Sequence, residues 1–323
     1  MSYIVTGGCG FIGSNFVNQL ASTTDKHIIV LDKLTYAADA TFIDKSLIQS
    51  NQVIITEIDI AKDTSTIDDI FNYNNIEGVF NFAAESHVDN SISDPDIFIQ
   101  SNVTGTFNIL EACRKYDTSR FLQVSTDEVY GSLQNYESSF TELTNLDPSS
   151  VYSASKGAAD LLVNAYHKTY KLNTVITRCC NNYGPHQHSE KLIPKVILNA
   201  LNDRPIPVYG KGDNVREWIH VIDHCTAIKL AYDHGVSGEV YNIGSGIEDK
   251  NIHLVKRVLK VLNKSAKLIT FVTDRKGHDL RYSIDSSKFI KLVGSKWTIR
   301  YPEEKFNEGL GQTAEWLRNK YLS

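Results

Sequence analysis

The stretch Tyr3-Ile-Val-Thr-Gly-Gly-Cys-Gly-Phe-Ile-Gly13 decides the fold expected for the first half of the chain. Its leading residues form a short apolar run typical of a buried strand, and an apolar pattern with helical spacing follows at 16–20. Gly7, Gly10 and Gly13 lie between them with G-x-x-G-x-x-G spacing. Strand, glycines and helix in this order predict a turn that can approach a phosphate group closely, at the N-terminus of the helix. A tight strand-to-helix turn without a ligand is the alternative.

The second predicted strand, His27–Asp32, ends in an acid. In a dinucleotide-binding unit a carboxylate at this position accepts a hydrogen bond from the 2′-hydroxyl of the adenosine ribose. It would also repel a 2′-phosphate, so Asp32 favours NAD over NADP as the cofactor. Lys33 follows directly, but we expect its ammonium group to be solvated.

Strands and helices then alternate with short connections. Further strands are expected at 53–59, 78–84, 121–124 and 173–179, and helices at 95–116 and 152–170. This alternation predicts an α/β fold with a Rossmann-like, doubly wound parallel sheet. We expect residues 1–180 to form the nucleotide-binding domain that carries the catalytic residues.

The pattern changes after residue 180. Residues 181–185 are expected to form a turn, and a helix is expected to open at 191–194. Short strands are predicted at 205–210 and 214–219, and a closing helix near 313–319. We therefore expect residues 181–323 to form a smaller C-terminal substrate-binding lobe, with some interleaving between the two parts.

Two polar clusters follow the fifth strand and open the next helix. The strand ends in Ser125-Thr-Asp-Glu128, and ligands of open parallel sheets bind at the carboxyl ends of the strands. Tyr152 and Lys156 lie one helical turn apart on the same face. A nearby ammonium group favours phenolate, so we expect Lys156 to lower the pKa of Tyr152 from about 10 and make it a base. A surface pair is the alternative for these two residues taken alone.

Composition argues against several classes of function. The 323-residue chain is 41% hydrophobic and 22% charged, as in ordinary globular proteins. Its net charge of -5 gives no general attraction to nucleic acid or to an anionic membrane, so neither partner is expected. No run approaches the roughly 18 apolar residues that span a bilayer. With no basic leader at residue 1, we expect a cytoplasmic protein.

Cysteine and histidine spacings do not indicate a metal site. The five cysteines lack a C-x-x-C spacing and are expected to be reduced, mostly buried thiols. His186 and His188 have no third ligand nearby in sequence, and His220 and His224 lack an H-E-x-x-H carboxylate. No metal site is expected.

With the glycine fingerprint, Asp32, Thr126, Tyr152 and Lys156 in this order, the chain resembles the extended short-chain dehydrogenase/reductase family over nearly its full length. Within that family it is most similar to NAD-containing enzymes that dehydrate a nucleotide-linked glucose. The motifs that carry this likeness are residues 32–36, 83–89, 125–131, 178–185, 214–218 and 274–279. Departures from the usual pattern are Ala38 to Ala40, Cys180, Lys276 and Leu280, none of which removes a catalytic group.

The resemblance implies three sets of site residues. The catalytic residues would be Thr126, Asp127, Glu128, Tyr152 and Lys156. NAD would be bordered by Gly7, Gly10, Phe11, Ile12, Gly13, Asp32, Lys33, Leu34, Thr35, Asp59, Ile60, Phe82, Ala83, Ala84, Glu85, Ser86, Ser101, Tyr152, Lys156 and Asn182. The sugar nucleotide would be surrounded by Ser86, Thr126, Asn181, Lys191, Leu192, Pro207, Val208, Tyr209, Arg216, Asn251, Asp274, Arg275, Lys276, Gly277 and His278. Arg216 and Arg275 could bind a diphosphate bidentately, and a surface salt bridge is the alternative for either.

It also implies a reaction. On dTDP-glucose, Tyr152 would take the C4 hydroxyl proton as NAD accepts hydride, with Thr126 bonded to the C4 oxygen. Glu128 would then remove the C5 proton, Asp127 would protonate the departing C6 hydroxyl, and hydride would return to C6. Adjacent carboxyl groups in different environments suit opposite roles, although the residues alone allow either assignment.

Two other functions remain possible from the sequence. A 4-epimerase uses the same tyrosine, lysine and NAD without the acid and base pair, and a non-catalytic NAD sensor would be expected to lack Tyr152 or Lys156. The resemblance further implies deoxysugar biosynthesis, such as that of dTDP-rhamnose, and a homodimer formed through the helices that follow residues 95 and 152. The sequence itself leaves the nucleoside, the downstream sugar and the oligomeric state undecided.

Overall fold

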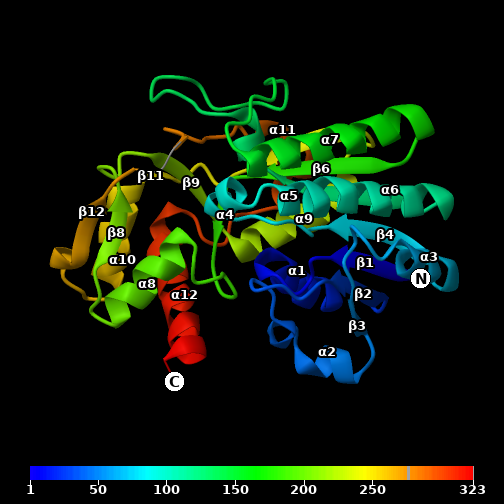
Figure 1. Cartoon of the computed structure of the whole chain (residues 1–323), viewed down its shortest axis with the longest axis horizontal. Helices are drawn as coiled ribbons and strands as arrows, with labels where there is room; N and C mark the ends of the chain where they lie inside the picture. The colour runs from blue at the N-terminus through cyan, green and yellow to red at the C-terminus, as the bar shows by residue number, and fades with distance from the viewer. Residues whose placement is uncertain (275–276, 323) are drawn as a thin grey trace.

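A seven-stranded parallel sheet forms the centre of the molecule (Figure 1). The structure, a computed structural model, describes residues 1–274 and 277–322. The strand order is β3-β2-β1-β4-β5-β6-β10, so the direction of winding reverses between β1 and β4. The strands are β1 (Ser2–Thr6), β2 (His27–Asp32), β3 (Val53–Glu57), β4 (Ile76–Asn81), β5 (Arg120–Thr126), β6 (Thr174–Cys179) and β10 (Glu239–Ile243). This confirms the predicted doubly wound α/β fold.

Helices cover both faces of the sheet because its strands are apolar on both sides. Tyr3 and Val5 of β1 belong to one core cluster, and Ile4 between them belongs to another. The first cluster packs α1 (Phe11–Ala21), α9 (Val221–His234) and α11 (Ser287–Val293) against the sheet. The second packs α3 (Thr64–Tyr73), α6 (Gly105–Lys115) and α7 (Val151–Tyr170). The remaining short helices here are α2 (Lys45–Gln49), α4 (Val88–Ser93) and α5 (Asp96–Phe98).

The helix expected at 95–116 is not α-helical throughout. A π-helical segment, Ile99–Thr104, connects α5 to α6. Such segments are rare and occur mostly at functional sites. It carries Ser101 and Asn102, and the Asn102 side chain bonds the backbone N–H of Glu85 (2.8 Å) and the hydroxyl of Ser155 (2.8 Å).

A smaller lobe lies beside the sheet (Figure 1). Its core combines helices with two small sheets, one ordered β11-β9-β7 and the other β12-β8. The strands are β7 (Asn181–Tyr183), β8 (Ile206–Tyr209), β9 (Val215–His220), β11 (Glu248–Lys250) and β12 (Ile269–Val272), and the helices are α8 (Leu192–Leu201), α10 (Asn251–Val261) and α12 (Phe306–Tyr321). Short 3-10 helices occupy Ala40–Phe42, Asp127–Tyr130, Ala266–Leu268, Gly294–Lys296 and Glu303–Lys305.

Part of the turn predicted at 181–185 is wrong. Asn181–Tyr183 is a strand, because β7 pairs in parallel with β9, a partner more than 30 residues away that local sequence does not reveal. The domain boundary predicted at residue 180 stays a prediction, and residues on both sides of it contribute to the large sheet. After β9 the chain returns to the large sheet, where α9 packs beside α1 and β10 pairs with β6.

Candidate active site

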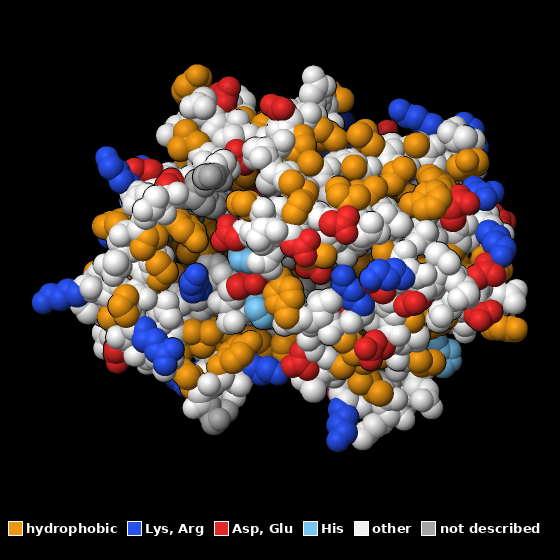
Figure 2. All heavy atoms as spheres, in the orientation of Figure 1, with side chains coloured by type: hydrophobic (Ala, Val, Ile, Leu, Met, Phe, Trp, Pro, Cys, Tyr) orange, Lys and Arg blue, Asp and Glu red, His pale blue; other side chains and the backbone are white. Residues whose placement is uncertain are grey.

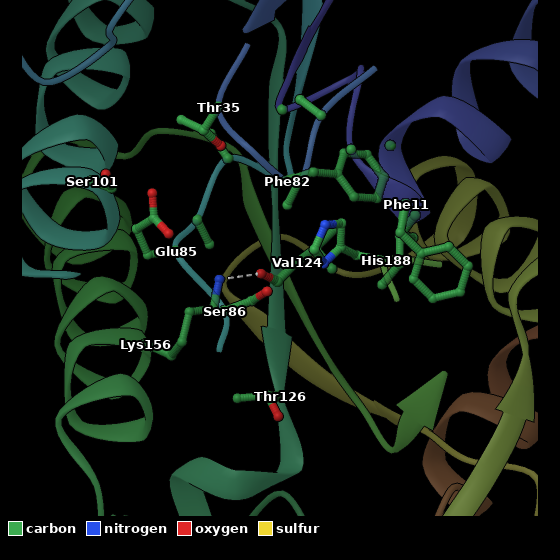
Figure 3. Close-up of a pocket in the computed structure, with 18 of the residues that line it drawn as sticks. Phe11, Thr35, Phe82, Glu85, Ser86, Ser101, Val124, Thr126, Lys156 and His188 are labelled. Atoms are coloured by element: carbon green, nitrogen blue, oxygen red, sulfur yellow. Dashed lines mark hydrogen bonds between the residues drawn. The ribbon is translucent and has the colours of Figure 1, made fainter. Parts of the chain in front are cut away.

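A cavity of about 290 Å³ opens at the carboxyl ends of the central strands. Residues that follow β1, β2, β4, β5 and β6 line it, together with the start of the lobe. It therefore lies at the reversal of strand order between β1 and β4, where ligands bind in open α/β sheets. Figure 3 shows Phe11, Phe82 and Lys156 reaching the same space from α1, the β4 loop and α7.

The glycine turn between β1 and α1 forms one wall. Gly7 has φ +65°, and a Cβ there would lie 2.7 Å from the backbone nitrogen of Ala83. A Cβ at Gly13 would overlap the carbonyl oxygen of Gly7. The turn therefore has room for glycine only at these positions, and it leaves the N-terminus of α1 facing the cavity, a favourable place for a diphosphate.

Asp32 lies at the far end of this wall and is buried. Its carboxylate accepts hydrogen bonds from the backbone N–H groups of Cys9 and Leu34, both at 2.9 Å. Burial raises the pKa of Asp32, and these two bonds oppose the rise. With the glycine turn, this fixed carboxylate supplies what the ribose and diphosphate of a dinucleotide require.

Nearly all residues predicted to border NAD line the cavity. They are Gly7, Gly10, Phe11, Ile12, Gly13, Asp32, Lys33, Thr35, Asp59, Ile60, Phe82, Ala83, Ala84, Glu85, Ser86, Ser101, Tyr152, Lys156 and Asn182. Leu34 is not among the lining residues; its backbone holds Asp32 instead. The Lys33 ammonium group donates to Ser101 (2.8 Å) and lies 3.3 Å from the Glu85 carboxylate, so it is not simply solvated.

Tyr152 and Lys156 project from the buried face of α7 into the cavity. The Lys156 ammonium group donates to the Val124 carbonyl at 2.7 Å, as Figure 3 shows. Burial lowers the pKa of Lys156. Burial also raises the pKa of Tyr152 well above its ordinary value, and the negative charge of Glu128 adds to the rise. The direction is therefore opposite to the lowering expected from Lys156, because burial is the largest influence on the Tyr152 pKa.

Thr126, Asp127 and Glu128 stand where β5 turns into a 3-10 helix. The Thr126 hydroxyl caps this helix by accepting from the Glu128 N–H (3.3 Å) and donates to one Asp127 oxygen (3.3 Å). Asp127 is only 1% exposed, and its Oδ2 has no hydrogen-bond partner among the described residues. Burial, with Glu128 and Glu217 nearby, raises the pKa of Asp127 well above its usual range. Asp127 is therefore suited to hold a proton at neutral pH.

Arg216 of β9 approaches this acid from the lobe. Its positive charge opposes the rise in the pKa of Asp127. The guanidinium group donates to the carbonyls of Val215 (2.7 Å) and Asp279 (3.0 Å) and lies over the Tyr282 ring at 4.2 Å. It thus holds residues 279–282 close to Asp127.

The residues predicted for the sugar nucleotide fall into two groups. Ser86, Thr126, Asn181 and Lys191 line the cavity, and the Lys191 ammonium group donates to the Ser86 carbonyl at 2.8 Å. Leu192, Pro207, Val208, Tyr209, Arg216, Asn251, Asp274, Gly277 and His278 are not among its lining residues. Some of the second group meet on the lobe, where His278 bonds Asp274 (2.6 Å) and its ring lies 6.1 Å from that of Tyr209. Arg275 and Lys276 lie outside the described residues.

Sequence reasoning missed several lining residues. Among them are Cys179, Gln187, His188 and Glu190. His188 points into the cavity in Figure 3. The signal available was position, because Cys179 ends β6 at the carboxyl edge of the large sheet and the other three residues come shortly after it in the chain. Across residues 1–274 and 277–322, no cluster of His, Cys, Asp or Glu could hold a metal ion, and no helix has the length and apolar character to cross a bilayer.

The comparisons with known proteins agree with this geometry. The chain belongs to the family described as GDP-mannose 4,6 dehydratase, whose profile matches residues 4–312. Among curated relatives, the dTDP-glucose 4,6-dehydratase of Salmonella typhimurium is 42% identical, covering 98% of this chain and 92% of its own. The low-salt glycan biosynthesis protein Agl12 of Haloferax volcanii is 47% identical over 96% of both chains.

Solved structures show the same similarity. DesIV of Streptomyces venezuelae, a dTDP-glucose 4,6-dehydratase with NAD and TYD bound, is 42% identical with a TM-score of 0.92, covering 99% of this chain and 97% of its own. A UDP-glucose 4-epimerase of Thermotoga maritima is 27% identical with a TM-score of 0.90, covering 99% of both. Fold alone therefore does not separate dehydration from epimerisation, and the side chains must.

Proposed function

We propose that this protein is a dTDP-glucose 4,6-dehydratase, which converts dTDP-glucose to dTDP-4-keto-6-deoxyglucose and water with tightly held NAD. One observation carries the proposal: Tyr152 and Lys156 line the same cavity as Asp127 and Glu128. The first pair serves hydride chemistry at a carbinol, and the second serves elimination. Full-length similarity of 41% or more to several curated dTDP-glucose 4,6-dehydratases supports the same substrate.

The glycine turn, Asp32 and residues 82–86 would hold NAD. When bound there, NAD supplies a hydride acceptor for C4 of the sugar and later a hydride donor for C6. Tyr152 takes the C4 hydroxyl proton, and Thr126 hydrogen-bonds the C4 oxygen. Because burial raises the pKa of Tyr152, its phenolate needs nearby positive charge, which Lys156 and the nicotinamide cation provide.

The two carboxyl groups then act on neighbouring carbons. The raised pKa of Asp127 keeps its proton available for the departing C6 hydroxyl, so Asp127 is the acid. Glu128 is half-buried and is the base that removes the C5 proton, which the C4 ketone has acidified. An epimerase needs neither group, so this pair favours dehydration over the epimerisation of the 27% identical neighbour.

A labelled substrate tests the proposal. With deuterium at C4 of dTDP-glucose, we expect the product to carry deuterium at C6, measured by mass spectrometry, even with unlabelled NADH in solution. NAD held along the glycine turn and Asp32 would stay bound during the cycle, so its hydride would not exchange with NADH in solution. Deuterium washed out to solvent, or NADH accumulating one for one with product, would contradict it. UDP-glucose and GDP-mannose in parallel reactions report the nucleoside preference.

We also propose a homodimer through α6 and α7. Phe107 of α6 and Leu161 of α7 are large apolar side chains that are 43% and 61% exposed, and Ile99 adds a third at 43%. Figure 2 shows hydrophobic side chains gathered over these helices. Replacing Leu161 by Glu should shift the sedimentation coefficient to that of a monomer, and Leu143→Glu, exposed elsewhere, should not.

The setting we propose is deoxysugar biosynthesis in the cytoplasm. All five cysteines are unpaired and buried, as is usual where thiols stay reduced. The 4-keto-6-deoxy product is the expected starting point for dTDP-rhamnose. Feeding it to a cell extract with NADPH and identifying the dTDP-sugar formed would test the pathway.

A further inference from the structure

A buried ion pair lies directly behind the catalytic lysine. Asp160 follows Lys156 by one helical turn and Tyr152 by two, so the three side chains share the buried face of α7. The Asp160 carboxylate is 0% exposed and accepts from Nε of Arg178 on β6 at 2.9 Å. Its other oxygen has no hydrogen-bond partner among the described residues. Burying such a pair costs more free energy than an apolar pair of similar shape, so fold stability alone does not account for it.

Arg178 also contacts the element that carries the acid and base. Its guanidinium carbon lies 4.8 Å from the ring centre of Tyr130, the last residue of the 3-10 helix Asp127–Tyr130. The Tyr130 hydroxyl is anchored in turn by the Asn242 side chain of β10, at 2.8 Å. One buried arginine therefore joins α7, with Tyr152 and Lys156, to the helix that opens with Asp127 and Glu128.

We propose that Asp160, Arg178 and Tyr130 form a positioning unit that balances the charge behind Lys156. The unit also holds the hydride-transfer residues Tyr152 and Lys156 in position relative to the acid Asp127 and the base Glu128. This inference rests on the proposed function and assigns three residues that do not line the cavity. Asp160 compensates the Lys156 ammonium group, and Arg178 neutralises Asp160 so that the anion does not hinder formation of the Tyr152 phenolate.

The charges around Lys156 agree with this role. Burial lowers the pKa of Lys156, and the negative charge of Asp160 opposes the fall, as does Cys179 on β6. From the 3-10 helix, Glu128 and Asp127 face Tyr152 and raise its pKa. Arg178 is the cation that pairs with Asp160 behind them. Changing the charge on either member of the pair should therefore move the titration of Tyr152 and Lys156 together.

The decisive test uses two variants with opposite charge changes. Asp160→Asn adds net positive charge, so both pKa values should fall and the pH profile of C4 oxidation should move down by about one unit. Arg178→Gln adds net negative charge and should move the profile up by a similar amount. The double variant restores the charge balance and should return the profile close to that of the parent. Loss of structure would not produce shifts of opposite sign.

A second readout does not depend on turnover. The tyrosine-ring NMR signal that disappears in Tyr152→Phe reports the Tyr152 titration directly, and it should shift in the same two directions. Asp223→Asn is a matched control, because Asp223 is also buried but accepts from the backbone N–H groups of Arg300 and Tyr301 on the opposite side of the sheet. It should lower the melting temperature without moving either profile.

Tyr130 tests the connection to the acid and base. Tyr130→Leu removes the ring from Arg178, so exchange of the C5 proton should slow by about tenfold while C4 oxidation keeps its rate. Tyr130→Phe keeps the ring over Arg178 but loses the hydroxyl that bonds Asn242, so its rate of C5 exchange should lie between those of the parent and Tyr130→Leu. Equal slowing of both steps in Tyr130→Leu, or pH profiles that do not move in the two charge variants, would overturn the inference. The proposed function is judged separately, by the parent's deuterium transfer.

Discussion

The two halves of the cavity are built in different ways. The cofactor half consists of short segments that directly follow β1, β2 and β4, and nearly every residue expected there lines the cavity. The substrate half combines the ends of β5 and β7 with a lobe made of segments spread from residue 181 to the C-terminus. Only some of the residues expected there reach the cavity. A binding site formed by local turns can be inferred from sequence motifs, whereas one assembled by a lobe depends on where the lobe packs.

The largest effect is expected from Tyr152→Phe, which removes the base of the first step. Oxidation at C4 should slow by about 10⁴-fold, the upper end for loss of a general base, because burial leaves no solvent base in its place. A single-turnover measurement of C4 hydride loss checks this. Tyr166→Phe on the same helix, whose hydroxyl bonds Glu111 outside the cavity, should retain the parent rate. A Tyr152→Phe rate within tenfold of the parent would remove Tyr152 from this role.

The next effect concerns the acid and base. Asp127→Asn and Glu128→Gln keep the side-chain shapes but lose the proton chemistry, so elimination should slow by about 10²- to 10³-fold. C4 oxidation should change far less, and the 4-keto-glucose intermediate should accumulate on the enzyme. Quenched-flow mass spectrometry separates the two steps. If either variant turned over like the parent, the assignment of acid and base would be wrong.

A smaller effect tests the cofactor half. Asp32 should make NADP bind more weakly than NAD by about 1–3 kcal/mol, because a 2′-phosphate would meet a buried carboxylate whose oxygens already accept two backbone bonds. Titration of cofactor-stripped protein with each dinucleotide measures this difference, and Asp32→Asn should narrow it. Equal or tighter binding of NADP by the parent would refute the preference.

The substrate half should respond more weakly to a single change. Arg216→Lys keeps the positive charge but loses the planar guanidinium group, so we expect KM for dTDP-glucose to rise about tenfold. NAD affinity should not change, because Arg216 is on β9 of the lobe and not on the segments that follow β1, β2 and β4. Arg281→Lys serves as a control, since its guanidinium group pairs with the Glu248 carboxylate of β11. A fall in kcat without a change in KM would instead assign Arg216 only to the loop that it holds.

Sequence patterns gave the strands of the large sheet, through β6, to within about three residues, because each is a compact apolar run bounded by turns. They did not give β7 or β10, whose pairing with β9 and β6 is set by long-range packing. The same limit applies to protonation. Spacing placed Lys156 beside Tyr152, but burial, which no local pattern reports, decides the direction in which the pKa of Tyr152 moves.

The smallest effect is one of stability. The raised pKa of Asp127 means that the folded state holds this proton more tightly than the unfolded chain, whose Asp pKa is about 3.9. Stability from this group is therefore full below about pH 4 and is lost as the pH rises toward the folded pKa. Asp127→Asn does not titrate, so this variant should be more stable than the parent at pH 7. Urea unfolding at several pH values measures the difference, which should vanish near pH 4.

Asp285 is a control for the stability test, because its pKa is lowered in the folded state whereas that of Asp127 is raised. Its carboxylate accepts from the Ser287 N–H at 2.8 Å, and hydrogen bonds from Ser287 lower the pKa of Asp285. A lowered pKa contributes stability above the unfolded value and loses it as the pH falls through the folded value. Asp285→Asn should therefore be less stable than the parent at pH 7, and the gap should close in acid. If Asp127→Asn were also less stable at pH 7, Asp127 would be an ionised structural carboxylate, and the acid in the proposed reaction would have to be another group.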